Sequence, residues 1–419
     1  MSRDIPDLDE FVVGARAWLE ANAARRAEAE KAWGTGSDDV SVFHDLTAGE
    51  ERDLLERLME WQRRKFDAGY GAIAWPTELG GAGLPAEYQD AFLTEEAAFE
   101  TPGGHETFSV TLRLVAPTIR VFGTPEQQQR LIPPFLRTEE LCCQLFSEPG
   151  AGSDLAGLGT RAVRDGDEWV INGQKVWSSG ARFSKYGELI CRTDPEAPKH
   201  AGLTVFILPL DRPGIEIRPI RQMSGGASFN EVFLDDVRVP DAFRLGEVGQ
   251  GWKVTLTTLA FERAASEHHR GGDKRGGTWE QVLALARAQG ATDDSVTRQR
   301  LASLYSLDRI RAAHAVRMAG SSTGDGAPSP VGSVAKLQWT QWMSAVSDVV
   351  SGLLGPRLVA DTGEWGTFAW AKHVLGAPGY RIAGGSDEIQ RNIIGERLLG
   401  LPPEPRVDRD VPFSKIPRG

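Results

Sequence analysis

The spacing of apolar residues changes twice along this chain of 419 residues, and this change constrains the fold more than any other feature. Up to about residue 140, apolar residues recur at intervals of three and four, which indicates amphipathic helices. Between residues 141 and 239 the period becomes two, in short runs separated by turns, which indicates β-strands without long helices between them. Helical spacing returns after Gly251. The order predicts an α+β fold with three domains: residues 1–140 helical, residues 141–245 a small antiparallel barrel or sandwich, and residues 246–419 helical.

Two helix starts carry clear capping signals. Thr47 and Glu50 form a Thr-x-x-Glu capping box, and Thr124-Pro125 supplies an N-cap residue followed by proline at the first helical position. Residues 321–330 are rich in Ser, Gly and Pro, so we expect an interhelical loop or a mobile lid there. The other expected helices cover residues 8–31, 87–100, 252–269, 279–289, 295–318, 334–354, 368–374 and 389–399.

Composition and charge exclude several classes of protein. The chain is 41% apolar and 25% charged, as globular proteins are, and its formal charge of −11 argues against a nucleic-acid-binding surface. Three cysteines give no disulfide framework and no metal-ligand spacing. No stretch is long and apolar enough to span a bilayer, and the first ten residues lack the basic and apolar regions of a signal peptide. We therefore expect a cytoplasmic protein whose partners are small molecules or proteins.

Residues 145–181 combine a small-residue loop with turn signals. In the loop 147–153, Pro149, Gly150, Ala151 and Gly152 leave almost no side-chain bulk, so a flat ligand could rest directly on backbone N–H groups. Asp165-Gly166 and Asn172-Gly173 lie between apolar runs and predict two hairpin turns, hence three successive antiparallel strands. The alternative is a β-meander with a glycine-rich entry loop and no ligand, because short glycine motifs also occur by chance.

Three motifs in this order resemble the acyl-CoA dehydrogenase family. The first is EPGAGSD at 148–154, followed by the NGxKxW pattern at 172–177 and two hydroxyl residues, Ser178 and Ser179. The others are a WPxExGG loop that begins at Trp75 and the C-terminal segment GGSDEIQRNIIGERLLGLP at 384–402. The resemblance covers roughly residues 46–402. It implies an N-terminal helical domain, a middle antiparallel β-barrel, a C-terminal four-helix bundle and FAD as cofactor.

The resemblance also implies a role for individual residues. The segment 144–153 would wrap the isoalloxazine ring, with the Ser147 hydroxyl and Ser179 near flavin N5, and Trp177 over the face away from substrate. Without the family, Trp177 would be equally well explained as a tryptophan that fills the β core. Arg391 and Arg397 are expected to be ordinary ion-pairing residues. The implied cofactor contacts are Gln144, Phe146, Ser147, Gly152, Ser153, Trp177, Ser178, Ser179, Ser386, Asp387 and Glu388, and the implied substrate contacts are Ser153, Arg263, Gly384 and Gly385.

The catalytic base is expected at Glu262. Many acyl-CoA dehydrogenases carry a catalytic glutamate at the position that is Gly384 here, which has no side chain. A smaller group, typified by the isovaleryl-CoA and long-chain enzymes, places it on the helix after the β domain in a Glu-Arg pair, which Glu262-Arg263 matches. The alternative is an ordinary surface Glu-Arg pair on an amphipathic helix. The resemblance implies transfer of the α-proton of an acyl-CoA thioester to Glu262 and of the β-hydride to FAD N5, with electrons passed on to an electron-transfer flavoprotein, as in lipid β-oxidation.

One departure from the family concerns the subunit interface. An Arg-x-x-Phe-Gly stretch that reaches a neighbouring subunit's flavin is replaced here by RGGDKRGGTWEQVLALARAQG at 270–290. Apolar residues at Trp339, Trp342, Leu353 and Leu354 favour a tetramer, either a homotetramer or an α2β2 heterotetramer. Two other functions therefore stay open: a catalytically silent subunit of a heteromer, and a flavin monooxygenase or nitroalkane-type oxidase on the same fold.

Overall fold

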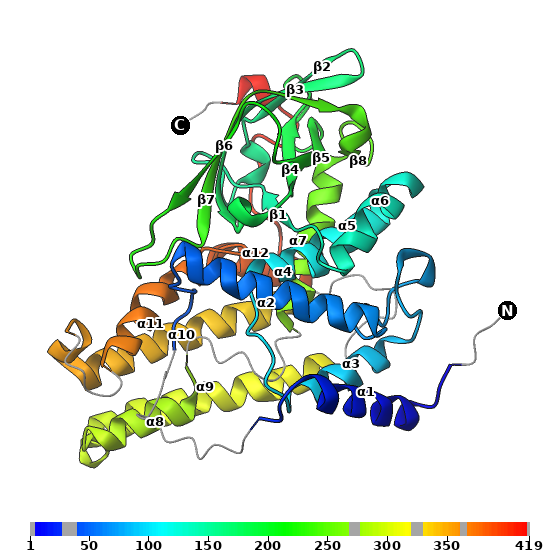
Figure 1. Ribbon diagram of the computed structural model, residues 1–419. Helices are drawn as coiled ribbons and strands as arrows, with labels where there is room; N and C mark the ends of the chain where they lie inside the picture. Colours follow the sequence, from blue (N-terminus) through cyan, green and yellow to red (C-terminus); the bar gives the residue numbers. More distant parts are fainter. Residues whose placement is uncertain (1–4, 27–39, 268–276, 320–329, 361–366, 417–419) are drawn as a thin grey trace.

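The computed structural model describes residues 5–26, 40–267, 277–319, 330–360 and 367–416. Figure 1 shows the strands gathered at one end of the molecule, with the N-terminal and C-terminal helices beneath them on opposite sides. The α, β, α order predicted from the sequence is therefore confirmed. The residues expected to form an interhelical loop or lid, 321–330, lie outside the described residues except for Pro330. Among the described helices, none combines the length and apolar character that crossing a membrane requires.

The N-terminal helices begin where the capping signals place them. The Thr47 hydroxyl accepts a bond from the Glu50 N–H at 3.3 Å, and the Thr47 N–H donates to the Glu50 carboxylate at 2.8 Å. Thr124 and Gln127 form a second capping box with Pro125 at the first helical position. The helices are α1 (Leu8–Asn22), α2 (Ala48–Asp67), α3 (Ala86–Glu96), α4 (Glu106–Ser109), the π-helical turn Val110–Val115, α5 (Ala116–Phe122) and α6 (Pro125–Leu136).

The middle domain is built on one mixed sheet in the order β6-β7-β3-β2-β4-β5-β8, with β1 paired to β4 beside this path. Most neighbours are antiparallel, but β1 and β2 each pair with β4 in parallel, which the antiparallel prediction did not include. Parallel neighbours need a long connection, and residues 146–185, which contain β2 and β3, supply it. The strands are β1 (Cys142–Leu145), β2 (Arg161–Asp165), β3 (Glu168–Ser179), β4 (Tyr186–Arg192), β5 (Leu203–Pro209), β6 (Ile215–Ile220), β7 (Phe229–Pro240) and β8 (Arg244–Leu245).

One of the two predicted hairpin turns is correct. Asp165 pairs with Glu168 across the turn between β2 and β3, and Gly166 has the positive φ of +66° that such a turn requires. The turn predicted at Asn172-Gly173 is wrong, because β3 continues unbroken and only shifts its register against β7 there. Asn172 exchanges two hydrogen bonds of 3.0 Å with Asp236 on β7, and these bonds bridge the irregularity. A partner 64 residues away thus overrides the local turn signal.

The C-terminal helices share a separate hydrophobic core. Helices α8 to α11 pack together around buried side chains such as Trp342, Met343 and Val346 of α10, Leu304 of α9 and Trp370 of α11. The helices are α7 (Gly251–Glu267), α8 (Trp279–Ala288), α9 (Ser295–Ala319), α10 (Gly332–Leu354), α11 (Thr367–Tyr380) and α12 (Asp387–Ile393), which continues into a π-helical turn, Ile394–Leu398. Helix α10 is central to this group, since α8, α9 and α11 all contact it.

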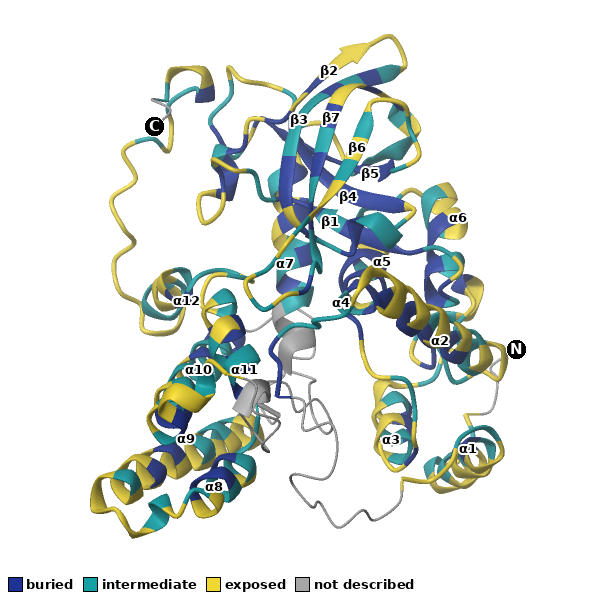
Figure 2. Cartoon of the chain, turned by 60° about the vertical axis from the view of Figure 1, so that its left-hand side comes forward, coloured by how far each residue is buried: buried dark blue, intermediate teal, exposed yellow. Residues whose placement is uncertain are grey.

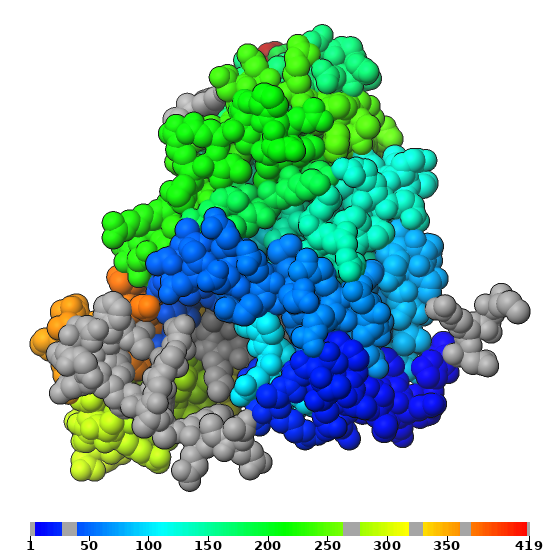
Figure 3. Space-filling model, viewed as in Figure 1, coloured from blue at the N-terminus to red at the C-terminus, as the bar shows by residue number. Residues whose placement is uncertain are grey.

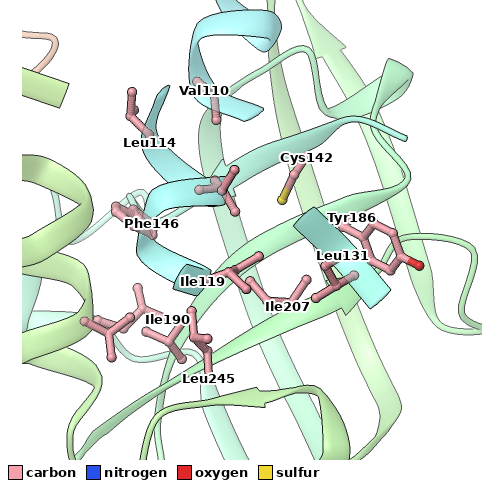
Figure 4. Close-up of a cluster of buried hydrophobic side chains, with 14 of the residues drawn as sticks. Val110, Leu114, Ile119, Leu131, Cys142, Phe146, Tyr186, Ile190, Ile207 and Leu245 are labelled. Atoms are coloured by element: carbon pink, nitrogen blue, oxygen red, sulfur yellow. The ribbon is translucent and has the colours of Figure 1, made fainter. Parts of the chain in front are cut away.

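A large apolar core joins the sheet to the helices that lie below it. Figure 4 shows Leu114 and Ile119 of the N-terminal helices facing Phe146, Ile190 and Ile207 of the β domain. The first turns of α7 belong to the same core. Figure 2 shows α7 leading from the sheet toward the C-terminal helices, so the first turns of this helix lie at the β domain and its last turns lie near the C-terminal helices.

Two further contacts tie the domains together. Figure 3 shows the β domain resting on α2, and there Arg182 contacts the carboxylate of Glu51. The C-terminal tail returns to the β domain, where the Phe413 N–H donates to the Ala197 carbonyl at 3.0 Å. The N-terminal helices, the β domain and the C-terminal tail are far apart in the sequence, and these contacts fix them relative to one another.

Candidate active site

The loop that follows β1 is anchored to β3 by a buried ion pair. Lys175 is fully buried, and its ammonium donates to the Glu148 carboxylate at 2.8 Å and to the Phe146 carbonyl at 3.0 Å. The same carboxylate accepts the backbone N–H groups of Gly159 and Thr160 at 2.7 and 2.9 Å. Burial raises the pKa of Glu148, but Lys175 and these donors outweigh it and hold that pKa below its usual range. Glu148 and Lys175 therefore hold the loop in place on its buried side.

The tip of this loop presents backbone to the outside. Glu148 and Ala151 exchange two backbone hydrogen bonds of 3.0 Å, which close the loop tightly. Gly150 and Gly152 are exposed, and a Cβ atom at either position would meet nothing within 4 Å. Packing within the described chain thus gives no reason for two glycines here. A ligand that lies flat on the loop would give one, because it needs the space that a side chain would occupy.

Trp177 is displayed at the surface by an irregular strand. The register of β3 against β7 shifts between Lys175 and Ser178, and Trp177 in this bulge has a φ of +62°. Its side chain is 59% exposed and touches Phe229 edge to face at 6.0 Å. The interpretation of Trp177 as a core tryptophan is therefore wrong. A bulky residue in this backbone region costs on the order of 1–3 kcal/mol and is found mainly at functional sites.

Several buried polar atoms near the loop lack hydrogen-bond partners among the described residues. Oγ1 of Thr160 is one, and Nε2 of Gln144 on β1 and Oγ of Ser178 on β3 are two others. A buried donor without a partner costs about 1–3 kcal/mol, so the atoms of Gln144 and Ser178 are suited to bind a polar group that is not part of the chain. Ser179 lines a small cavity beside Gly180 and Ser228. Phe146 is buried in the apolar core, whereas Ser147 is half-buried and Ser153 is exposed.

Glu262 of α7 meets the Gly384-Gly385 turn. Both glycines have left-handed backbone, with φ of +65° and +83°. A Cβ atom at Gly384 would lie only 3.0 Å from Oε1 of Glu262. The carboxylate thus lies beside the place where a side chain at residue 384 would begin, and it is directed at the turn. The side chain of Arg263 lies outside the described residues.

The residues after the Gly384-Gly385 turn mainly make hydrogen bonds that hold the local fold in place. Ser386 caps α12 by accepting the Ile389 N–H at 3.3 Å. Asp387 is buried, and its carboxylate accepts bonds from Thr340 at 2.8 Å and Arg381 at 2.9 Å. Glu388 is exposed and lies 3.6 Å from Arg391, which agrees with the ion-pairing role expected for that arginine. The side chain of Asp387 is therefore committed to the fold, although it belongs to the motif.

Sequence reasoning missed two residues that hold the Gly384-Gly385 turn. The Gln390 amide donates to the carbonyls of Gly384 and Gly385 at 3.0 and 3.1 Å. Lys336 of α10 donates to the Gly385 carbonyl at 2.6 Å. Lys336 and Asp348 are the only charged residues of α10, and this was the available signal for Lys336, since buried lysines nearly always have a partner.

A series of aromatic contacts connects the β3 bulge with the C-terminal helices. Trp177 contacts Phe229, and the ring centroids of Phe229 and Phe43 lie 5.3 Å apart. Phe43 stacks on Tyr380 at 4.7 Å with nearly parallel planes, and Tyr380 packs against Trp339 at 4.5 Å. The bulge on the middle domain and the end of α11, four residues before Gly384, therefore belong to one connected region.

Three family models together match most of the chain. The model for the N-terminal domain of acyl-CoA dehydrogenases matches residues 47–139, the model for the middle domain residues 143–237, and the model for the C-terminal domain residues 249–399. Among curated proteins, the acyl-CoA dehydrogenase IpdE1 of Mycobacterium tuberculosis is 38% identical over 402 residues, which cover 95% of this chain and 99% of the relative.

Solved structures agree with these matches. The Tcur3481-Tcur3483 steroid ACAD has 29% identity and a TM-score of 0.71, covering 96% of this chain and 99% of that one. The ChsE4-ChsE5 complex from Mycobacterium tuberculosis has 28% identity and a TM-score of 0.69, covering 96% and 100%. A glutaryl-CoA dehydrogenase from Mycobacterium smegmatis in complex with FADH2 shares the fold, with 21% identity, a TM-score of 0.64 and coverage of 94% and 95%.

Proposed function

This chain belongs to the acyl-CoA dehydrogenase family, and we propose that it is a catalytic member in which Glu262 removes the α-proton of an acyl-CoA thioester. The observation that carries this proposal is the 3.0 Å separation between Oε1 of Glu262 and the Cβ position of Gly384. The family's two alternative places for the base are thus neighbours in space. A carboxylate from α7 reaches the position that a glutamate at residue 384 would serve.

The turn beside Glu262 offers the second element of the reaction. A general base works only if the carbonyl next to the α-carbon is polarised as the proton leaves. The backbone N–H of Gly384 is the proposed donor to the thioester oxygen, and the glycine leaves room for the substrate to approach. Gly385, Ser153 and Arg263 remain the other proposed substrate contacts.

We further propose that the open loop and the Trp177 bulge form the FAD site. Gly150 and Gly152 leave space over the loop, Trp177 presents an aromatic face, and Gln144 and Ser178 hold polar atoms without partners in the described chain. FAD, when bound, would accept the β-hydride of the substrate. Phe146, Ser147, Ser153, Ser179, Ser386, Asp387 and Glu388 complete the proposed contacts, of which Asp387 would act through its backbone because its carboxylate is occupied.

Similarity to the Tcur3481-Tcur3483 steroid ACAD and to the ChsE4-ChsE5 complex supports two finer proposals. The first is a polycyclic acyl group on the CoA thioester. The second is assembly with a different subunit, with an electron-transfer flavoprotein as electron acceptor. Resemblance to a complex of two chains also favours the second candidate function, a subunit without catalysis of its own.

The test is anaerobic titration of the purified protein with CoA thioesters of straight-chain, branched and steroid side-chain acids, while the flavin absorbance is followed. Glu262→Gln should keep FAD but reduce it roughly 10³-fold more slowly, because the general base is lost. Glu247→Gln, which removes an exposed glutamate just before α7, is the matched control and should react normally.

Three outcomes would contradict the proposal. Flavin reduction at near wild-type rate in Glu262→Gln would place the base elsewhere. A flavin that no thioester reduces would favour the subunit without catalysis, and rapid reoxidation of the reduced flavin by oxygen would favour an oxidase. Moving the carboxylate, in Glu262→Gly with Gly384→Glu, should restore part of the rate, limited by the left-handed backbone at residue 384.

A further inference from the structure

The Gly384-Gly385 turn depends on side chains from two other elements. Two consecutive glycines have the widest backbone freedom of any dipeptide, so their peptide groups keep one orientation only if something fixes them. Lys336 of α10 donates to the Gly385 carbonyl at 2.6 Å, and Gln390 of α12 donates to both glycine carbonyls. These contacts use the two glycine carbonyls, and the N–H groups of Gly384 and Gly385 make no hydrogen bond to the backbone of the described residues.

The Lys336 ammonium lies within a group of charges. Its side chain is only 11% exposed, and its nitrogen lies 3.9 Å from the Asp387 carboxylate. The other charged groups that face it are Glu262 on α7, Glu388 on α12 and Arg381 after α11. Burial lowers the pKa of Lys336, while the three carboxylates raise it and Arg381 lowers it further.

Asp387 has the strongest electrostatic interaction with Lys336, and Glu262 follows it. The Asp387 carboxylate is already bound by Thr340 at 2.8 Å and by Arg381 at 2.9 Å. The short bond of Lys336 goes to a neutral carbonyl, and Glu388 is exposed and lies beside Arg391. The partly buried carboxylate of Glu262 on α7 and the ammonium of Lys336 on α10 therefore both lie next to the Gly384-Gly385 turn.

We propose that Lys336 is a positioning residue of the dehydrogenation: it fixes the glycine turn that receives the thioester oxygen, and its charge keeps Glu262 ionised and ready to accept the α-proton. This inference rests on the proposed role of Glu262. The two effects are separable, because the first needs a hydrogen-bond donor at residue 336 and the second needs a positive charge there.

The test compares Lys336→Met, Lys336→Gln and Lys336→Arg, all loaded with FAD, by the pH dependence of flavin reduction with a reactive acyl-CoA. Losing the charge should move the acidic limb of the pH–rate profile to higher pH by about one unit in the Met and Gln variants. Lys336→Arg should keep the limb in place. Lys336→Met should also lower the limiting rate at high pH about tenfold, the cost of one misplaced catalytic contact, and Lys336→Gln less, because it retains a donor.

Two further measurements keep the result interpretable. Lys372→Met, which removes a partly buried lysine that lies 3.6 Å from Asp45, should change neither limb nor limiting rate. Hydrogen exchange of the backbone amides in residues 380–390, measured without substrate, should be faster in Lys336→Met than in Lys336→Gln or wild type. This measurement does not depend on turnover. If Lys336→Met does not fold, Lys336→Gln and Lys336→Arg still separate charge from hydrogen bonding.

The outcomes distinguish this inference from the proposed function. An unchanged acidic limb in Lys336→Gln, together with an inactive Glu262→Gln, would overturn the role of Lys336 alone. A shifted limb that Lys336→Arg fails to restore would also overturn it, because size rather than charge would then be decisive. A fully active Glu262→Gln would overturn the base assignment and the charge effect together.

Discussion

At the scale of single residues, the carboxyl of Glu188 is unusual because an acidic side chain is completely buried there. It is fully buried on β4, where its neighbour in register on β1 is Gln144. Thr258 of α7 donates to one of its oxygens at 2.6 Å, and the other oxygen has no partner among the described residues. Burial raises the pKa of Glu188 to about 8 against the hydrogen bond from Thr258, which lowers it. Burial raises the pKa of the Cys142 thiol on β1, and the nearby Glu188 carboxyl raises it further.

The raised pKa of Glu188 predicts a loss of stability with rising pH. The folded state holds this proton up to a pKa of about 8, whereas the unfolded chain releases it near 4.5, so the folded state binds more protons between these values. The free energy of unfolding should therefore fall across this window, by at most about 1.4 kcal/mol per pH unit from this group. Glu188→Gln removes the titrating group and should become more stable than wild type as pH rises through the window.

Urea unfolding of wild type and Glu188→Gln at several pH values checks this. The difference between the two free energies of unfolding should be smallest near the lower end of the window and level off above the upper end. Parallel pH profiles for the two proteins would contradict the buried neutral acid.

At the scale of elements, the loop 147–153 and β3 act as one unit. Lys175 and Glu148 join them by a buried ion pair, and the Val176 N–H donates to the Ser147 carbonyl at 2.9 Å. The same strand carries the strained, exposed Trp177 two residues after Lys175. The strained backbone of Trp177 and the open space over the loop glycines are exposed, while the buried Lys175–Glu148 ion pair holds the loop and the strand together.

Gly152→Leu tests whether this surface holds the cofactor. We expect the wild-type protein to purify yellow with FAD, and the leucine variant to retain much less, because its side chain enters the space over the loop backbone. Gly103→Leu is the matched control, since that glycine is also exposed and a Cβ there meets nothing within 4 Å. The measurement is the ratio of flavin to protein absorbance. Equal FAD content in both variants would remove the loop from the proposed site.

At the scale of the whole molecule, exposed apolar residues near the C-terminus predict assembly. Trp339, Trp342, Leu353 and Leu354 of α10 favour a tetramer by sequence, but Trp342 and Leu354 are buried in the helical core, because α10 is surrounded by its neighbours. The large exposed apolar side chains of this domain lie elsewhere, and they include Ile310, Val316, Leu375, Ile382, Leu399 and Leu401. Exposed apolar side chains of this kind are candidates for a surface covered by another subunit.

We predict a tetramer, alone or with a second type of subunit, by light scattering of the FAD-containing protein. Replacing Ile382 and Leu399, which are 72% and 67% exposed, with glutamate should dissociate it, because charges would be buried at the interface. Val13→Glu, at a 64% exposed position on α1, should leave the assembly intact. A monodisperse monomer that still binds FAD would contradict the prediction.

The features that the sequence by itself determined are local or carried by motifs. The N-caps at Thr47 and Thr124 and the turn at Gly166 involve atoms within four residues, so the sequence signal and the structure coincide. The order of helical and β segments follows from periodicity alone. The proposal that Glu262 is the base also starts from the sequence, in which residue 384 is a glycine.

What only the tertiary structure decided depends on partners far along the chain. The turn signal at Asn172 fails because Asp236 holds a continuous strand, and the parallel pairing of β1 with β4 joins residues more than 40 positions apart. The exposure of Trp177 depends on a register shift against β7. Likewise, Lys336 and Glu262 become neighbours of the same two glycines only because α7 and α10 pack together, and contacts of this kind carry no signature in local sequence.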